Sequence, residues 1–350
     1  MNRLVETLVE QGKPIRRAKE SNPEAAISYK AALGRALCDV MEENAKTFIL
    51  GQDVGRFSIG GITTGLIDSF GAARVRDCPI SESAMIGMAV GAAMNGYTVV
   101  VELAYADIAA VAFSSIVHAA AKIPYATNGQ LRCPLIVRSP VNRFSRHGPM
   151  GTEVTASWFY NVPDIDIAMP ADSHEAYWLL RHAFERPVPT IFLEDRSLNA
   201  TVGVIGERAE ILSRPRVLRP GSDVTVIGAG RMATLALQAA EALATARRGI
   251  DVRVVSLGTV KPLDIDTVRT ESLATRRVLI VQEEPRFGGY GPVIQSILAE
   301  LPLGTLKQPP ALLARPNTFL PYNREEDLLP SANAIADGVR ALLFGKDEIG

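Results

Sequence analysis

Glu82 is the side chain whose neighbours in the sequence most suggest chemistry. It opens the stretch ESAMIGMAVGAAMNGYTVVVE, which carries no other charge until Glu102. An acid at the start of a helix often does no more than interact with the helix dipole. Here, however, Gly87 and Gly91 are four residues apart, so they lie on one helical face that a second helix can approach closely. An acid at the end of such a dry contact is placed to share a proton with a bound heterocycle.

His147 is a second candidate, and it lies in the polar segment RFSRHGPMG. Two interpretations stay open for a loop histidine flanked by Arg143 and Arg146. It is either an exposed side chain of no chemical consequence, or a group that transfers protons or steers anions at the edge of a cleft.

The segment VIGAGRMATLA, residues 226–236, matches a dinucleotide-binding turn only in part. Ala233 occupies the third glycine position, and Asp251 opens the following strand instead of closing it. A partial fingerprint of this kind is weak, so a tight strand-to-helix turn is the favoured interpretation. The sequence contains neither a phosphate-binding GKS/T loop nor a Gly-x-Ser-x-Gly elbow, which leaves P-loop and serine-hydrolase chemistry without an anchor.

Predicted strands and helices alternate along the chain. Apolar residues at helical spacing predict a helix over 27–46 with Ser28 as its N-cap. Residues 106–126 predict one long helix of small side chains, and residues 251–262 predict one strand. Such alternation is typical of parallel sheets with right-handed crossovers. We therefore expect an α/β protein with two three-layer α/β/α domains, at 27–200 and 221–350. An N-terminal arm is expected at 1–26 and a linker at 201–220.

The composition excludes several classes of function. Across 350 residues the net charge is −1, which gives no sign of a nucleic-acid partner or an anionic membrane surface. Three widely separated cysteines and four histidines show no metal-ligand spacing. No apolar run reaches the ~20 residues that a membrane span needs, and the first residues lack the apolar region of a signal peptide. The expected location is therefore the cytoplasm.

A family resemblance is carried by a series of segments that occur in the family's order. The chain resembles the β subunits of thiamine-diphosphate-dependent 2-oxoacid dehydrogenase decarboxylating components, of the pyruvate, branched-chain or acetoin type. The resemblance implies a pyrimidine-binding domain followed by a transketolase-type C-terminal domain. The segments are GQDVGRF, CPISESAMIGMAVGAAMNG, HAAAKIPYATNGQL, PLIVRSP, DVTVIGAG, VKPLD and EEPRFGGYG.

This resemblance implies a catalytic role for Glu82. In the family, a glutamate in this motif hydrogen-bonds N1′ of the cofactor's aminopyrimidine and favours its imino tautomer. The cofactor then performs the difficult chemistry, while the protein tunes and orients it. The resemblance also places Ile80, Gln52, Tyr105 and Ile108 at the cofactor.

Three positions depart from the family pattern near this site. Gln52 stands where the family usually has an acid that is thought to relay protons between sites. Ile108 stands where an aromatic ring normally stacks on the aminopyrimidine, with Tyr105 as one substitute. Gly151 stands where the family has a histidine that helps to transfer the acyl group to a lipoyl arm. His147, four residues earlier, is a candidate replacement and is predicted to be catalytic.

Two further features concern metals and partners. Arg186 and Val188 stand where an Asp and an Asn of a K⁺ site are expected in some family members, so we expect that site to be lost. The sequence contains no Gly-Asp-Gly, which in the family begins the site for the diphosphate and Mg²⁺. The resemblance therefore implies an α subunit that holds Mg²⁺, and an α2β2 heterotetramer with thiamine diphosphate at each α/β seam.

The expected function is that of a β subunit that decarboxylates a 2-oxoacid together with its α subunit and passes the acyl group to a lipoyl acyltransferase. Two alternatives stay open. One is a biosynthetic carboligase, or an acyl transferase to a non-lipoyl acceptor. The other is a non-catalytic scaffold subunit. Retention of Glu82 in its full motif argues against the scaffold, because a scaffold does not need that acid.

Overall fold

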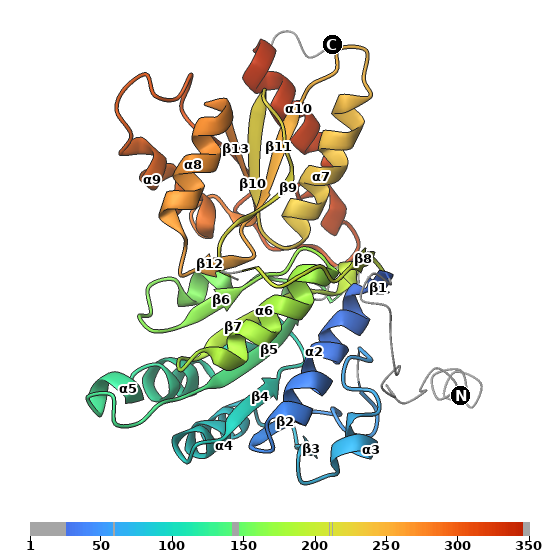
Figure 1. Cartoon of the computed structure of the whole chain (residues 1–350), viewed down its shortest axis with the longest axis vertical. Coiled ribbons are helices and arrows are strands. Elements are labelled where there is room, and N and C mark those ends of the chain that lie inside the picture. The colour runs from blue at the N-terminus through green and yellow to red at the C-terminus, as the bar shows by residue number, and fades with distance from the viewer. Residues whose placement is uncertain (1–25, 59, 142–146, 210, 212, 346–350) are drawn as a thin grey trace, which may run out of the picture.

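The computed structural model describes residues 26–58, 60–141, 147–209, 211 and 213–345. They form two lobes stacked along the long axis of the molecule, each built on its own sheet (Figure 1). The strand order is β12-β6-β7-β5-β4-β2-β3 in the first sheet and β14-β13-β10-β11-β9 in the second. All strand pairs are parallel except β12 with β6 and β9 with β11, together with a separate two-stranded ribbon, β1 with β8.

The strands of the first lobe are β2 (Thr47–Gly51), β3 (Val75–Asp77), β4 (Thr98–Glu102), β5 (Leu135–Val141), β6 (Asp166–Ala168), β7 (Thr190–Asp195) and β12 (Thr259–Lys261). Its helices are α2 (Tyr29–Glu43), α3 (Leu66–Phe70), α4 (Glu82–Met94), α5 (Ile123–Ala126) and α6 (Ser173–Glu185). The ribbon strands are β1 (Ala26–Ser28) and β8 (Val202–Val204).

The strands of the second lobe are β9 (Arg216–Arg219), β10 (Val224–Gly228), β11 (Val252–Ser256), β13 (Val278–Pro285) and β14 (Ala311–Arg315). Its helices are α7 (Arg231–Ala244), α8 (Ile265–Thr275), α9 (Tyr290–Ala299) and α10 (Ala332–Phe344). Short 3₁₀ segments include η1 (Ala106–Ala110) and η5 (Arg196–Leu198).

Each sheet is covered by helices on both faces because its strands are apolar on both sides. In β4, Val100 packs with α2 and α6, whereas Val99 and Val101 pack with α4 on the opposite face. In the second lobe, α7 and α10 cover one face and α8 and α9 cover the other. The predicted pair of three-layer α/β/α domains is confirmed. The predicted N-cap is confirmed as well, since Ser28 Oγ accepts a hydrogen bond from the Ala31 amide at 3.2 Å.

The long helix expected over 106–126 is broken into three pieces. The structure has η1, then a π-helical turn, η2 (Ser115–Ala120), and then the short α5 with Pro124 in its first turn. The Ser83 hydroxyl donates to the Val111 carbonyl at 2.6 Å. A side chain that occupies a helical carbonyl in this way interrupts the regular hydrogen-bond ladder. The same contact ties this segment to the first turn of α4.

The strand expected over 251–262 is also divided. Gly258, with φ +60°, forms a turn after β11 that most other residues would adopt only with strain. The chain then leaves the second sheet, and β12 pairs antiparallel with β6 at the edge of the first sheet. The strand β12, which follows β11 of the second lobe in the sequence, is therefore part of the sheet of the first lobe. One hydrophobic core cluster contains residues of both lobes.

Candidate functional site

The predicted site residues follow the carboxyl ends of neighbouring strands in the first sheet. Gln52 follows β2, Glu82 follows the loop after β3, Tyr105 follows β4, and His147 lies beyond β5. In parallel α/β sheets, this edge is where ligands bind, because the loops that join strands to helices meet there.

Glu82 is the first residue of α4, and its side chain is only 6% exposed. The Gln52 side-chain amide donates a hydrogen bond to Glu82 Oε1 at 2.8 Å. Within the described residues, Oε2 of Glu82 has no hydrogen-bond partner. Oε2 is not one of the fully buried oxygens that lack a partner, so it is accessible and can accept a hydrogen bond from a bound ligand.

The turn after β2 is constrained in a way that fixes Gln52. A Cβ at Gly51 would lie 2.8 Å from the Glu102 carbonyl oxygen, so only glycine fits between the two strands. Asp53 has φ +52°, an uncommon conformation for a residue with a side chain. Asp77 at the end of β3 accepts a hydrogen bond from the Gly55 amide at 2.6 Å. Strained, clamped backbone of this kind is typical of functional sites.

The glycine face of α4 is open. A Cβ added at Gly87 or Gly91 would meet no heavy atom within 4 Å. Met88, between them in the sequence, is 45% exposed. In the described part of this chain nothing covers the face that the sequence marks for close packing, whereas Glu82 lies on the buried face of the same helix.

Tyr105 and His147 meet across the strand ends. Their ring centroids lie 5.1 Å apart with the planes tilted by 44°. Both side chains are half-buried, as is Ile108 in η1. Ile80, in the loop before α4, is 83% exposed. The structure thus joins the predicted residues into two pairs, Gln52 with Glu82 and Tyr105 with His147, with Ile80 at the rim.

The side chain of His147 lies where a side chain at position 151 would begin. A Cβ built on Gly151 would lie 2.9 Å from His147 Cβ and 3.3 Å from its Cγ. Real side chains essentially never approach as closely as 2.9 Å, so the Cβ of His147, with its ring carbon Cγ beside it, fills the volume in which a side chain at position 151 would begin. The absence of a side chain at position 151 therefore leaves the room that the side chain of His147 occupies.

We expect Gly151→Ala to displace the His147 ring and to destabilise the protein by about 1–3 kcal/mol, as overpacking does. The unfolding midpoint in urea, compared with the parent chain, measures this. In the double variant Gly151→Ala/His147→Gly, which also removes the Cβ that lies at 2.9 Å, most of the loss should be recovered. Equal destabilisation of the single and double variants would contradict the shared-space interpretation.

A buried ion cluster lies under the site, and sequence reasoning missed it. Arg138 in β5 binds Glu102 at 2.5 Å and Glu194 at 2.7 Å, and all three side chains are buried. Burial raises the pKa of Glu102, and Arg138 opposes that shift. Burial also acts to lower the pKa of Arg138, but the charges of the two glutamates raise it overall. The signal was present, because each of the three charges directly follows a run of apolar residues in its strand.

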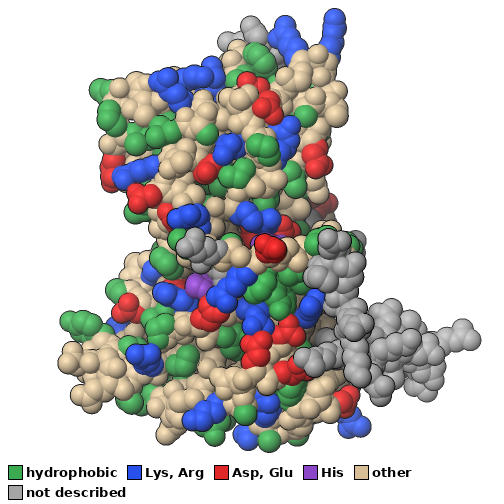
Figure 2. Space-filling model, viewed as in Figure 1, with side chains coloured by type: hydrophobic (Ala, Val, Ile, Leu, Met, Phe, Trp, Pro, Cys, Tyr) green, Lys and Arg blue, Asp and Glu red, His purple; other side chains and the backbone are tan. Residues whose placement is uncertain are grey.

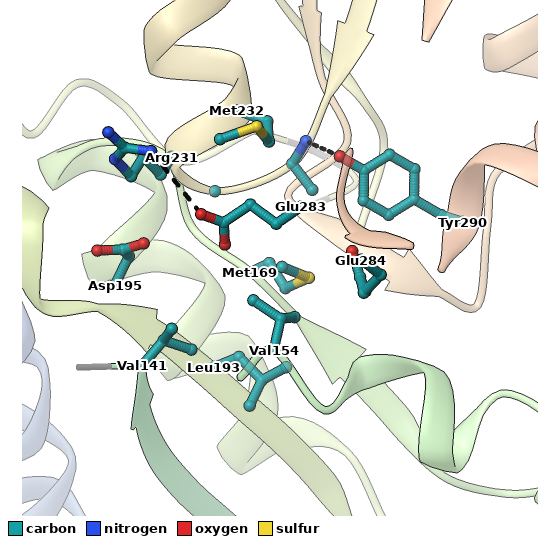
Figure 3. Close-up of a pocket in the computed structure, with 12 residues that line it drawn as sticks. Val141, Val154, Met169, Leu193, Asp195, Arg231, Met232, Glu283, Glu284 and Tyr290 are labelled. Carbon is teal, nitrogen blue, oxygen red and sulfur yellow. Dashed lines mark hydrogen bonds and ion pairs between the residues drawn. The ribbon is translucent and has the colours of Figure 1, made fainter. Parts of the chain in front are cut away.

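The two lobes enclose a small pocket at the carboxyl ends of their sheets (Figure 3). Arg231 at the start of α7 lies 3.8 Å from Glu283 of β13, and Asp195 from the end of β7 also lines the pocket. The Tyr290 hydroxyl accepts a hydrogen bond from the Ala229 amide at 3.1 Å. The Gly230 amide donates a hydrogen bond to the Met169 carbonyl at 3.0 Å, and this contact holds the GAG turn, residues 228–230, against the first lobe. The turn therefore serves to pack one lobe on the other.

The segment compared with a K⁺ site contains an ion pair. Arg186 Nε donates to Asp166 Oδ2 at 2.6 Å, so the guanidinium places a fixed positive charge beside that carboxylate. Among the described residues, no group of three or more His, Cys, Asp or Glu side chains is arranged to hold a metal ion. None of the described helices is both long and apolar enough to cross a bilayer.

Comparison with known proteins decides the family. The transketolase pyrimidine-binding domain family matches residues 25–201, and the transketolase C-terminal domain family matches residues 214–335. The 2-oxoisovalerate dehydrogenase β subunit of Bacillus subtilis (strain 168) is 35% identical over 305 residues, covering 85% of this chain and 92% of that protein. The chain belongs to the E1 β-subunit family of thiamine-dependent 2-oxoacid dehydrogenases.

The chain is similar to other E1 β subunits as well. The pyruvate dehydrogenase E1 β subunit of Rhizobium meliloti (strain 1021) is 30% identical over 326 residues, covering 91% of this chain and 70% of that protein. Two solved structures share the fold of this E1 β-family chain. A split-gene transketolase, described as an inactive β4 tetramer, has a TM-score of 0.75 at 23% identity and covers 92% of this chain and 100% of its own. A transketolase mutant from Pichia stipitis has a TM-score of 0.68 at 16% identity, with 95% and 48% covered.

Proposed function

We propose that this chain is the catalytic β subunit of a 2-oxoacid dehydrogenase that uses thiamine diphosphate and directs it through Glu82. The observation that carries this proposal is the state of the Glu82 carboxylate. It is buried at the first turn of α4, one oxygen accepts from Gln52, and the other has no partner among the described residues. That second oxygen suits the N1′ position of an aminopyrimidine.

The residues around Glu82 fit such a ring. When bound, thiamine diphosphate would supply the electron sink that allows a 2-oxoacid to lose CO₂. Gln52 fixes the orientation of Glu82, and because an amide does not titrate, it donates a hydrogen bond without taking the proton. The half-buried side chains of Tyr105 and Ile108 offer a ring and an apolar surface at the next strand end. Exposed Ile80 adds apolar area at the rim.

An α subunit completes the proposed site. The open glycine face of α4 provides a surface for close helix packing, and Glu82 lies in the first turn of the same helix. The chain has no Gly-Asp-Gly, so the diphosphate and Mg²⁺ are assigned to the α subunit. We therefore propose an α2β2 heterotetramer that is active only when both subunits are present, and a cytoplasmic location.

This assembly can be tested with the purified α and β subunits. Thiamine diphosphate with Mg²⁺ should bind the mixed complex and neither subunit alone, as followed by calorimetry or circular dichroism. The complex should release CO₂ from at least one 2-oxoacid. Cofactor binding without CO₂ release from any 2-oxoacid would refute the proposed reaction. Absence of cofactor binding by the complex would favour a scaffold.

His147 is proposed to act in acyl transfer to a lipoyl acyltransferase. Its ring contacts Tyr105 and fills the space beside Gly151, so it reaches the strand edge from a different loop position than the family histidine. We expect His147→Ala to slow reductive acylation of a lipoyl domain by about 10²-fold or more, the usual loss for a proton-transfer group.

The same variant should leave CO₂ release to an artificial electron acceptor within a few-fold of the parent. His182→Ala, on α6, is the matched control, and both of its rates should stay unchanged. If both rates fell equally in His147→Ala, the ring would serve decarboxylation or folding instead of acyl transfer.

A second candidate function is transfer of the acyl group to a non-lipoyl acceptor, or carboligation. Two observations favour it: Gln52 cannot relay a proton as an acid can, and Gly151 lacks the side chain used in the family. Transfer to a lipoyl group and carboligation can be distinguished by supplying the α/β complex with a lipoyl domain or with an aldehyde and measuring which acceptor gives a product. Product from the aldehyde alone would select the carboligase.

A further inference from the structure

A cavity of about 170 Å³ lies between α6 of the first lobe and the segment that leads into the second. Its walls include the apolar Trp178, Leu179 and Pro215, and the basic Arg214. Figure 2 shows Lys and Arg side chains, with Asp and Glu side chains beside them, at this waist between the lobes.

The connecting segment is fixed to α6 on both sides of the cavity. On one side, the Gly206 amide donates to His174 Nδ1 at 3.1 Å, and the Trp178 indole donates to the Gly206 carbonyl at 2.9 Å. On the other side, Arg216 binds Asp172 and also Glu175, the latter at 3.2 Å. The space between these two anchors is therefore a formed cavity with fixed ends.

The polar groups of the wall are mainly donors. Because His174 Nδ1 accepts from a backbone amide, the proton of the neutral ring is on Nε2, which makes Nε2 a donor. Burial lowers the pKa of His174, and the charge of Arg216 lowers it further, so the ring is neutral at pH 7. The Arg214 guanidinium is half exposed and lies 3.6 Å from Asp264, a separation too long for a good hydrogen bond.

The one acid in the wall is already satisfied. Glu175 accepts from Arg216, from the Ala171 amide at 2.9 Å and from the Ser256 hydroxyl at 2.9 Å. Its two oxygens are occupied by these donors, so it leaves no open acceptor toward a ligand, although Arg216 is shared with Asp172 and offsets only one of the two negative charges. The wall thus combines an apolar body with an arginine and a donor imidazole.

We propose that this cavity binds a small monocarboxylate with a branched or aromatic tail, with its carboxylate at Arg214 and its tail against Trp178 and Leu179. The ligand would touch both α6 and the start of the second lobe, and so stabilise the contact between them. This inference does not depend on the proposed reaction, because it concerns a separate cavity.

The test uses the purified full-length chain with isobutyrate and benzoate as probes, and isobutanol and benzyl alcohol as uncharged controls. Calorimetry should give a dissociation constant of about 1 mM for at least one carboxylate and no binding of the alcohols. At about ten times that concentration, the carboxylate should raise the thermal midpoint by about 2 °C.

Two arginine variants locate the binding. Arg214→Gln should weaken carboxylate binding at least tenfold. Arg208→Gln removes an equal charge from the arginine that lies over the Trp178 ring at 5.9 Å and does not line the cavity, so it should bind as the parent does. Absence of carboxylate binding, equal binding by Arg214→Gln, or equally tight binding of inorganic phosphate would each overturn the proposal.

Discussion

Glu82→Gln is expected to reduce 2-oxoacid-dependent CO₂ release by the α/β complex about 10²–10⁴-fold, the usual range for loss of a proton-transfer group. The amide keeps the size of the side chain, and one of its atoms can still meet Gln52. It cannot share a proton with a ring nitrogen as a carboxylate does. Steady-state CO₂ release at saturating 2-oxoacid and cofactor measures the effect.

The control for this variant is Glu241→Gln, an exposed acid on α7, which should keep the parent rate. Loss of the Glu82 charge from the first turn of α4 should cost only about 0.3–1 kcal/mol in stability. A fall in activity with a nearly unchanged urea midpoint would therefore be chemical in origin. If Glu82→Gln kept a rate within a few-fold of the parent, the proposed role of this acid would be wrong.

Arg138→Met is expected to be the most destabilising single change, at about 3–5 kcal/mol, because it leaves two buried glutamates without their counter-charge. Methionine fills much of the same volume, so the loss is mainly electrostatic. The urea midpoint at pH 7 measures it. Arg35→Met, on the partly exposed surface of α2, is the matched control and should change stability by less than about 1 kcal/mol. A similar loss in both variants would contradict the assigned role of the buried cluster.

The cluster also predicts a pH dependence. Because burial raises the pKa of Glu102, the folded protein binds this proton more tightly than the unfolded chain does. The contribution of Glu102 to stability therefore falls as the pH rises from the unfolded value, near 4.5, through the folded value. Glu102→Gln should remove this contribution and still leave Arg138 paired with Glu194. The difference in urea midpoint between pH 5 and pH 7, compared in the two proteins, tests the sign.

Much of the fold followed from patterns that act locally. Apolar runs alternating with helical periodicity predicted both three-layer domains, and the Ser28 cap followed from its position before an apolar helix. The broken helix over 106–126 could not be predicted in this way, because the Ser83 hydroxyl that occupies the Val111 carbonyl is 28 residues away in the sequence. The switch of β12 to the other sheet likewise depends on tertiary pairing after the turn at Gly258.

The positions of the candidate residues in the fold were predictable where these residues follow strand ends. Gln52, Glu82 and Tyr105 were placed by motif and order, and the structure brings Gln52 to Glu82 and Tyr105 to His147. The close approach of His147 to Gly151 could not be predicted, because it depends on the conformation of the loop. A spacing of four residues does not tell which side chain fills the volume beside position 151. The Asp77 clamp on the Gly55 amide was missed for the same reason.

The exchanged strand β12 means that the first lobe is not a separable module. A fragment that ends near residue 200 would lose this strand and leave β6 as an open edge, with unpaired backbone groups ready to join another sheet. We therefore expect the excised pyrimidine-binding half to self-associate through this edge, even though its sequence has the pattern of a complete domain.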